Sequence, residues 1–207
     1  MDYDARLVSD KVLSRTDRLR DAMLIVLDLD ETLVHSTLEP LSRPADFLTG
    51  AHYTYVRPGA RDLIAFCRRN FRVGVWTSST RDYAHVIVGE LFGSDPRLEF
   101  FWTRERCDQA RQVLGWTSTV YWKKDLTRLR DHGFALEQVL VIDDSPHAYR
   151  SNSHNLIPVL PFYGDAEDRE LIHLAGYLPA LLDVTDVQTI DKRTWRTQPS
   201  GRDTRKA

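Results

Sequence analysis

The chain has 207 residues, 42% of them hydrophobic, which is enough apolar sequence for one folded domain and excludes a disordered protein. Its 28 lysines and arginines nearly balance 30 aspartates and glutamates, so the net charge of -2 gives no bias toward nucleic acid or an anionic membrane as a direct partner. Two cysteines without metal-ligand spacing, no signal-peptide pattern and no long apolar run predict a reduced, cytoplasmic protein, with a single disulfide as the alternative.

The first predicted strand is the apolar run at residues 24–27, which leads into Asp28, Asp30 and Thr32. Continuous aliphatic sequence is typical of a parallel strand covered on both faces, and ligands bind beyond the carboxyl ends of such strands. Two carboxylates this close repel each other unless a cation lies between them. Mg²⁺ takes oxygen ligands of this kind, and an ionised aspartate beside it can attack phosphorus. The alternative is an acidic turn without function.

Helical and strand-like patterns alternate along the rest of the chain. They are a helix or arm at 5–20, an irregular connection at 36–52, a strand at 53–57, a helix at 58–70, a strand at 71–76, a helix at 81–93, strands at 98–102 and 118–122, a helix at 126–132, strands at 139–142 and 156–160, and a helix at 167–182 that Pro179 interrupts. Residues 103–117 carry no clear pattern. This alternation predicts an α/β fold of three layers, with a mostly parallel central sheet and helices on both faces.

Two further apolar runs end in polar side chains. The run at 71–76 leads into the hydroxyls of residues 77–80, and the run at 139–142 leads into Asp143 and Asp144. Because the carboxyl ends of parallel strands meet at one edge of a sheet, we expect these groups to surround Asp28 and Asp30.

The motifs resemble those of haloacid-dehalogenase-superfamily phosphatases, in particular the small phosphatases of the RNA polymerase II C-terminal domain, the NLI-interacting-factor-like family. The resemblance covers residues 23–187 and depends on four ordered motifs: D-L-D-E-T-L-V-H at 28–35, W-T-S-S at 76–79, K-D-L at 124–126 and D-D-S-P at 143–146. It implies a haloacid-dehalogenase-like, Rossmann-like fold. The expected organisation is an N-terminal arm or helix at 1–22, a phosphatase domain at 23–190 with an insertion at about 36–56, and a polar tail at 191–207 that is frayed from residue 193.

The resemblance also implies a Mg²⁺-dependent phosphatase that forms an aspartyl phosphate. Asp28 is implied as the nucleophile and a metal ligand. Asp30 is implied as the general acid and base, with its backbone carbonyl on the metal. Thr77 and Ser78 are implied to bind the phosphoryl oxygens, and Lys124 to neutralise their charge.

Asp144 stands where the resembled phosphatases usually carry a metal-binding asparagine, and its extra charge predicts tighter metal binding. Asp143 is then expected to support the site by orienting Lys124 or a metal-bound water, with Thr32 as a second supporting residue. An exchange of roles between the two aspartates is the alternative. Trp76 and Trp122 are interpreted as packing residues rather than substrate platforms, and His35 as a structural histidine rather than a proton shuttle.

The expected substrate is phosphoserine or phosphothreonine in a protein or peptide, with Phe47, Tyr53 and Tyr55 lining a groove. One alternative is a small-molecule or phosphotyrosine phosphatase with the same site, favoured if residues 36–52 cap the cleft. Another is a non-catalytic binding module, as in the related translocase subunit of the mitochondrial inner membrane, which predicts decay of the motifs. A monomer without a membrane partner is expected, although the sequence leaves the oligomeric state open.

Overall fold

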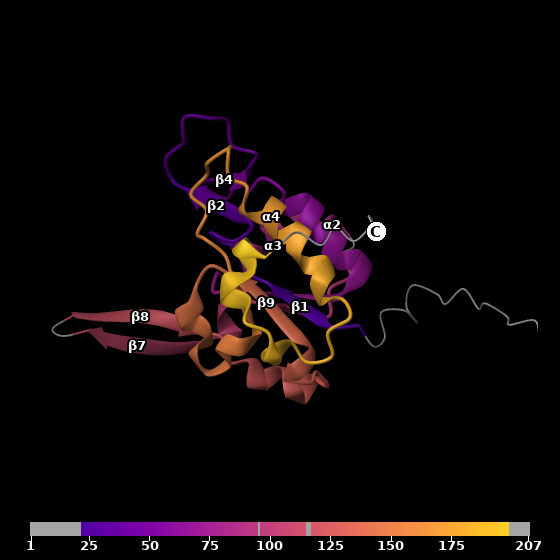
Figure 1. Cartoon of the computed structure of the whole chain (residues 1–207). Coiled ribbons are helices and arrows are strands. Elements are labelled where there is room, and N and C mark those ends of the chain that lie inside the picture. Colours follow the sequence, from indigo (N-terminus) through magenta and orange to yellow (C-terminus); the bar gives the residue numbers. More distant parts are fainter. Residues whose placement is uncertain (1–21, 95, 115–116, 199–207) are drawn as a thin grey trace, which may run out of the picture.

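The computed structural model describes residues 22–94, 96–114 and 117–198, so the arm or helix expected at 5–20 lies outside the described residues. Its centre is a five-stranded sheet in the order β10-β9-β1-β5-β6, in which every pairing is parallel. The strands are Leu24–Leu27 (β1), Arg72–Trp76 (β5), Phe101–Trp102 (β6), Val139–Asp143 (β9) and Leu156–Pro158 (β10). The predicted parallel sheet is confirmed, and β1 lies at its middle (Figure 1).

Helices of different kinds cover the two faces of this sheet. Ile25 and Leu27 of β1 contribute to a core under the α-helices, whereas Leu24 and Val26 contribute to a core closed by 3₁₀ helices. Alternate side chains of a strand point to opposite faces, so one continuous apolar run fills both cores. The predicted three layers are confirmed. The α-helices are Ala60–Asn70 (α2), Arg81–Phe92 (α3) and Glu170–Tyr177 (α4), and the 3₁₀ helices on the other face are Leu126–His132 (η2), Leu136–Gln138 (η3) and Pro146–Asn155 (η4).

The connection after β1 contains a second sheet. Strands Val34–Thr37 (β2), Phe47–Thr49 (β3) and His52–Val56 (β4) pair antiparallel in the order β2-β4-β3. The buried hydroxyl of Thr54 lies 2.9 Å from that of Ser36 and 2.8 Å from that of Thr49. The expectation of an irregular stretch at 36–52 is therefore wrong in part, because hydroxyl pairs between short strands replace the apolar pattern that marks longer ones.

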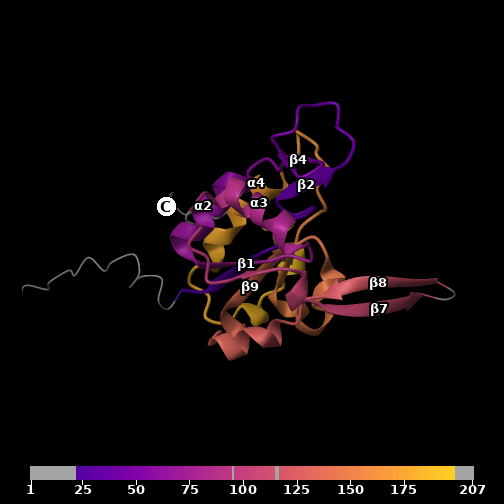
Figure 2. The same ribbon diagram turned by 180° about the vertical axis from the view of Figure 1, so that it is seen from behind.

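A two-stranded hairpin projects from the body of the molecule, as Figures 1 and 2 show from opposite sides. It consists of Asp108–Leu114 (β7) and Thr117–Lys123 (β8), paired antiparallel. The strand expected at 118–122 is confirmed, but it pairs with the stretch that carried no clear pattern. The exposed side chains of Asp108, Gln109 and Arg111 explain why β7 lacks an apolar signature.

The C-terminal part of the chain packs on the sheet. Pro179 ends α4, as expected, and the chain continues as Leu178–Leu181 (η5). The expectation of a frayed tail from residue 193 is wrong for the part that lies in Lys192–Thr197 (η7), because Trp195 is only 1% exposed and its Nε1 donates to the carbonyl of Pro158 at 2.8 Å. One buried tryptophan thus anchors an otherwise polar segment.

Two simpler expectations concern the cysteines and the membrane. Cys67 and Cys107 are both free, so the alternative of a disulfide between them is not supported. Within the described ranges, no helix has the length and apolarity needed to traverse a bilayer.

Gly74 in β5 lies too close to Phe100 to accept a side chain. A Cβ added there would lie between 2.4 and 2.8 Å from three atoms of the Phe100 ring. We expect Gly74→Ala to lower the free energy of unfolding by about 1–3 kcal/mol, the usual cost of overpacking. Gly89→Ala on α3 is the matched control, since its Cβ meets no atom within 4 Å and alanine favours a helix by about 1 kcal/mol. Urea unfolding measures both variants, and equal losses would contradict the prediction.

Candidate active site

A cavity of about 250 Å³ lies at the carboxyl end of the central sheet. Asp28 follows β1, and Asp143 and Asp144 lie at the end of β9, the neighbouring strand. Because Leu27 pairs with Ile142, the three carboxylates come together, and one oxygen of each lies within 4.8 Å of the others. Asp30, Ser78 and Lys124 also line the cavity. The structure therefore brings six of the predicted site residues to one place.

Lys124 lies between two of the carboxylates. Its Nζ donates to Asp28 Oδ1 and to Asp143 Oδ2, each at 2.7 Å. The lysine is buried, and its own backbone N–H donates to the carbonyl of Ala148, which fixes the end of β8 against η4. The amine therefore offsets the charge of these two carboxylates, and its predicted contact with a phosphoryl group stays a prediction.

Asp143 is the most fully bonded of the three carboxylates. Besides Lys124, it accepts hydrogen bonds from the Tyr149 hydroxyl at 2.9 Å and from the backbone N–H of Ser145 at 2.8 Å. Asp144 instead accepts a longer bond from the Thr32 hydroxyl at 3.3 Å, while its backbone N–H donates to the same hydroxyl at 3.1 Å. Asp143 thus faces the lysine, and Thr32 supports Asp144.

Negative charge accumulates at these strand ends. Burial and the Asp143 charge raise the pKa of Asp28 well above its usual value, against the opposing effect of Lys124. Burial, with Asp143 and Glu31, raises the pKa of Asp144 to about 6. Burial alone would lower the pKa of Lys124, but Asp143 and Asp28 outweigh it and the pKa lies well above its usual value. A site crowded with carboxylate oxygens fits a hard divalent cation such as Mg²⁺.

Asp30 is held by donors outside this cluster. Its Oδ2 accepts a hydrogen bond from the Ser79 hydroxyl and its Oδ1 one from the Tyr83 hydroxyl of α3, both at 2.5 Å. The sequence predicted a helix at 81–93, and no feature of its pattern shows that the Tyr83 hydroxyl reaches back to the site.

Thr77 is fully buried behind the cavity wall rather than part of it. Its backbone N–H donates to the carbonyl of Trp102 at 3.0 Å, and its hydroxyl accepts from the backbone N–H of Ser79 at 3.1 Å. Ser78 reaches the cavity in its place. The contact predicted between Thr77 and a phosphoryl oxygen stays a prediction.

The hairpin supplies a wall that the sequence interpretation missed. Trp122 of β8 lines the cavity, and the Arg104 guanidinium lies 5.3 Å from its ring centre. The interpretation of Trp122 as a packing residue rather than a substrate platform stays a prediction. Trp76 is fully buried, as expected. Tyr121 also lines the cavity and meets His147 edge to face, with ring centres 5.1 Å apart.

The aromatic residues of the insertion lie elsewhere. Phe47, Tyr53 and Tyr55 do not line this cavity. Tyr55 is fully buried and its hydroxyl accepts a hydrogen bond from the backbone N–H of Leu41 at 2.7 Å, so it is part of the fold of the small sheet. The predicted groove is therefore not formed by these residues at the cavity.

Comparison with known proteins shows one consistent family. The sequence profile described as NLI interacting factor-like phosphatase matches residues 23–188. A probable C-terminal domain small phosphatase of Dictyostelium discoideum is 32% identical over 174 residues, covering 80% of this chain and 53% of the relative. The carboxy-terminal domain RNA polymerase II polypeptide A small phosphatase 2 of Homo sapiens is 31% identical over 186 residues, covering 84% and 62%. The chain thus spans little more than half the length of these relatives.

A further relative and two solved structures complete the comparison. CTD nuclear envelope phosphatase 1B of Danio rerio is 29% identical over 206 residues, which is 92% of this chain and 79% of the relative. An uncharacterized protein from Listeria monocytogenes shares the fold with a TM-score of 0.50 at 13% identity, covering 77% of this chain and 98% of that one. The RNA polymerase II CTD phosphatase Fcp1 aligns with a TM-score of 0.48 at 22% identity, covering 79% and 50%.

Proposed function

This chain belongs to the family of NLI interacting factor-like phosphatases, and we propose that it is a Mg²⁺-dependent phosphatase that hydrolyses phosphoserine or phosphothreonine in proteins. The observation that carries the proposal is the cluster of Asp28, Asp143 and Asp144, in which the buried Lys124 amine bonds Asp28 and Asp143. Phosphoryl transfer needs a positioned nucleophile and positive charge for the phosphoryl oxygens, and this cluster offers both. The non-catalytic alternative predicted decay of these residues, and all of them are in place.

Asp28 is the proposed nucleophile. One of its carboxylate oxygens attacks phosphorus, the bond from phosphorus to the substrate oxygen breaks, and an aspartyl phosphate forms that water then hydrolyses. Burial and Asp143 raise the pKa of Asp28, so the attacking ionised form depends on the positive charge beside it. Lys124, 2.7 Å away, supplies part of that charge.

Asp30 is the proposed general acid and base. It would give a proton to the leaving oxygen of the substrate and then take one from the attacking water. The hydroxyls of Ser79 and Tyr83 hold one carboxylate oxygen each, which limits the directions in which the acid can face. The proposal thus gives the two aspartates of the first motif different tasks because they have different neighbours.

Asp28, Asp144 and the backbone carbonyl of Asp30 are the proposed ligands of Mg²⁺. Asp143 is occupied by Lys124, Tyr149 and Ser145, whereas Asp144 accepts one long bond from Thr32, which supports Asp144 as the ligand. When bound, the ion supplies positive charge for the phosphoryl oxygens and for the crowded carboxylates. Thr77 and Ser78 stay the proposed phosphate contacts.

We expect Asp144→Asn to keep activity but to require about tenfold more Mg²⁺ for half-maximal hydrolysis, because an amide oxygen ligates without charge. Asp144→Ala should lose activity, since it offers no ligand. The exposed Asp131→Asn is the matched control and should titrate like the wild type. A Mg²⁺ titration of p-nitrophenyl phosphate hydrolysis measures all three. An unchanged requirement in both Asp144 variants would favour Asp143 as the ligand.

A second cavity supports a peptide as the substrate. It has a volume of about 410 Å³, and its charged lining residues are Arg81, Glu105 and Arg106. The turn Arg104–Arg106 (η1) lies between the two cavities, since Arg104 Nε donates to the carbonyl of Ser78 at 2.6 Å and its guanidinium lies over Trp122. A cavity beside the phosphate site gives room for the part of a peptide that flanks its phosphorylated residue. Residues 36–52 do not line the first cavity, which gives no support to a capped small-molecule site.

The names of the relatives refer to the carboxy-terminal domain of RNA polymerase II, which supports a phosphoprotein substrate for this chain too. The proposal is tested by hydrolysis of p-nitrophenyl phosphate with Mg²⁺ and with EDTA, followed by a phosphopeptide array beside a panel of phosphometabolites. We expect EDTA to remove activity and phosphoserine or phosphothreonine peptides to be preferred. No hydrolysis of any phosphate ester would overturn the enzyme proposal, and a preference for phosphotyrosine or metabolites would overturn the substrate.

Location and assembly stay predictions. The sequence predicts a cytoplasmic monomer, and one relative carries the nuclear envelope in its name. Fractionation of cells and light scattering of the pure protein test the two statements separately.

A further inference from the structure

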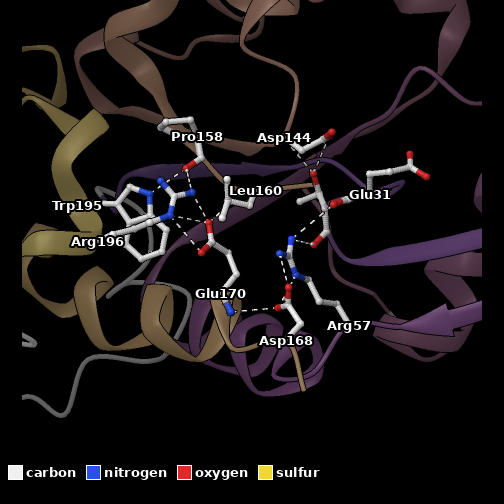
Figure 3. Close-up of polar contacts among 10 residues, drawn as sticks. Glu31, Arg57, Asp144, Pro158, Leu160, Asp168, Glu170, Trp195 and Arg196 are labelled. Atoms are coloured by element: carbon white, nitrogen blue, oxygen red, sulfur yellow. Dashed lines mark hydrogen bonds and ion pairs between the residues drawn. The ribbon is translucent and has the colours of Figure 1, made fainter. Parts of the chain in front are cut away.

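Arg57 is an arginine whose side chain is 0% exposed, which is rare for this residue type unless it is paired. Its Nε and Nη2 donate to the two carboxylate oxygens of Asp168, at 2.9 and 2.8 Å. Its Nη1 faces the other way and donates to the backbone carbonyls of Thr32 at 3.2 Å and Glu31 at 3.4 Å (Figure 3). A single guanidinium therefore joins the segment before α4 to the turn at residues 30–33, which carries part of the active site.

The 30–33 turn needs such support. Glu31 has a φ of 55°, a left-handed backbone conformation that is unfavourable for a residue with a side chain. The Glu31 carbonyl also accepts a hydrogen bond from the backbone N–H of Phe162 at 2.7 Å, and the Phe162 ring lies under the Arg57 guanidinium, 5.3 Å from its centre. Bonds from two distant segments thus hold the strained turn in one conformation.

The 30–33 turn determines the positions of two proposed site residues, Asp30 and Asp144. Asp30 directly precedes Glu31, and the Thr32 hydroxyl bonds both the backbone N–H and the carboxylate of Asp144. A shift of the turn would therefore move the proposed acid and the proposed metal ligand together. Misplacement by about 1 Å is enough to cost an enzyme roughly 10²-fold in rate.

We propose that Arg57 is a positioning residue, which sets the geometry of Asp30 and Asp144 through the carbonyls of the 30–33 turn. The inference deepens the proposed phosphatase function and rests on it. Arg57 is proposed to contact neither the substrate nor the metal and to act only through its bonds to the turn. Asp168 balances the buried charge, so that the guanidinium can face the turn without adding an unpaired cation near the site.

A second ion pair at the start of α4 provides the matched control. Glu170 binds the Arg196 guanidinium, with Nε at 2.9 Å from Oε1, and also accepts from the backbone N–H of Leu160 at 2.8 Å. Figure 3 shows both pairs: Arg57 with Asp168 on the side of the turn, and Arg196 with Glu170 on the side of Trp195. Arg196 also donates to the carbonyl of Pro158, at 3.0 Å, and its contacts are with β10 and α4, not with the 30–33 turn.

The test compares Arg57→Lys with Arg196→Lys. Lysine keeps the charge but cannot reproduce the planar fork that joins Asp168 to the two carbonyls. We expect Arg57→Lys to lower kcat for p-nitrophenyl phosphate at least tenfold with KM changed less than threefold. The increase in melting temperature on adding Mg²⁺ should also shrink, because Asp144 is displaced. Arg196→Lys should keep kcat within twofold and the full Mg²⁺ effect, even if it lowers the melting temperature equally.

The outcomes separate the inference from the proposed function. The positioning role is overturned if Arg57→Lys keeps the wild-type kcat and the wild-type increase in melting temperature with Mg²⁺. It is also overturned if Arg57→Lys and Arg196→Lys lose kcat equally. An inactive wild type overturns the phosphatase proposal, and the Mg²⁺ effect on melting then decides the role of Arg57 alone. If Arg57→Lys does not fold, Asp168→Asn takes its place, with an expected loss of kcat of about threefold or more and the same control.

Discussion

Asp28→Asn should abolish turnover and leave the protein folded. An amide cannot form the aspartyl phosphate, and loss of a catalytic nucleophile typically costs about 10⁴-fold or more in kcat. The melting temperature should not fall, because the substitution removes a negative charge that burial and Asp143 disfavour. Steady-state hydrolysis of p-nitrophenyl phosphate and a thermal melt without divalent cations measure the two effects.

The pH dependence of this stability effect has a defined sign. The pKa of Asp28 is raised in the folded protein, so between the unfolded and folded pKa values the native state binds more protons than the unfolded chain. The contribution of Asp28 to wild-type stability therefore falls as pH rises from about 4. We expect the melting temperature of Asp28→Asn minus that of the wild type to increase as pH rises over the same range. The control is Asp62→Asn at an exposed position of α2. If Asp28→Asn kept the wild-type kcat, Asp28 would not be the nucleophile.

Lys124→Met should reduce both stability and activity. It removes the amine between Asp28 and Asp143 and leaves two buried carboxylates unpaired, and breaking a buried ion pair on one side typically costs about 3–5 kcal/mol. The kcat should fall about 10²–10³-fold, in the range for loss of one group that stabilises developing charge. Urea unfolding and steady-state kinetics measure these changes.

The loss in Lys124→Met should lessen under two conditions. Burial and the Asp143 charge already raise the pKa of Asp28, so this carboxylate is protonated in the folded state as pH falls, and the stability of Lys124→Met relative to the wild type should recover. Added Mg²⁺ should also restore part of the lost stability, since a cation at Asp28 and Asp144 replaces part of the missing positive charge. Lys123→Met is the matched control, because Lys123 pairs with the half-buried Asp125 at 2.9 Å and such pairs contribute about 1 kcal/mol or less. Equal losses of stability and kcat in Lys124→Met and Lys123→Met would contradict the proposed role of Lys124 in charge neutralisation.

The sequence predicted the central sheet well because its strands are buried on both faces. β1 and β9 are continuous aliphatic runs, and the rule that parallel strands end at one edge placed Asp28, Asp143 and Asp144 together. Lys124 follows no apolar run of the central sheet, and only the family resemblance singled it out. The structure brings its amine to the same edge through the hairpin and η4.

Contacts between distant side chains were not predictable in the same way. Arg57 and Asp168 are 111 positions apart, and neither stands in a motif that indicates the other. Tyr83 and Trp122 belong to elements that were recognised, but periodicity reports which face of an element is apolar and not which hydroxyl or ring reaches a cavity. The Nε1 of the buried Trp195 bonds the carbonyl of Pro158, and no local sequence pattern predicts this contact.

The central place of β1 has a consequence for how the chain folds. Leu24 pairs with Arg72 on one side and with Val139 on the other, so the strand that carries Asp28 is completed by a segment made much later. Contacts that close such long loops form slowly. A nascent chain that ends after β5 has the nucleophile but neither Lys124 nor Asp144. We therefore expect phosphatase activity to emerge only with the final long-range pairing, so that recovery of activity during refolding reports the last step of folding rather than the first collapse.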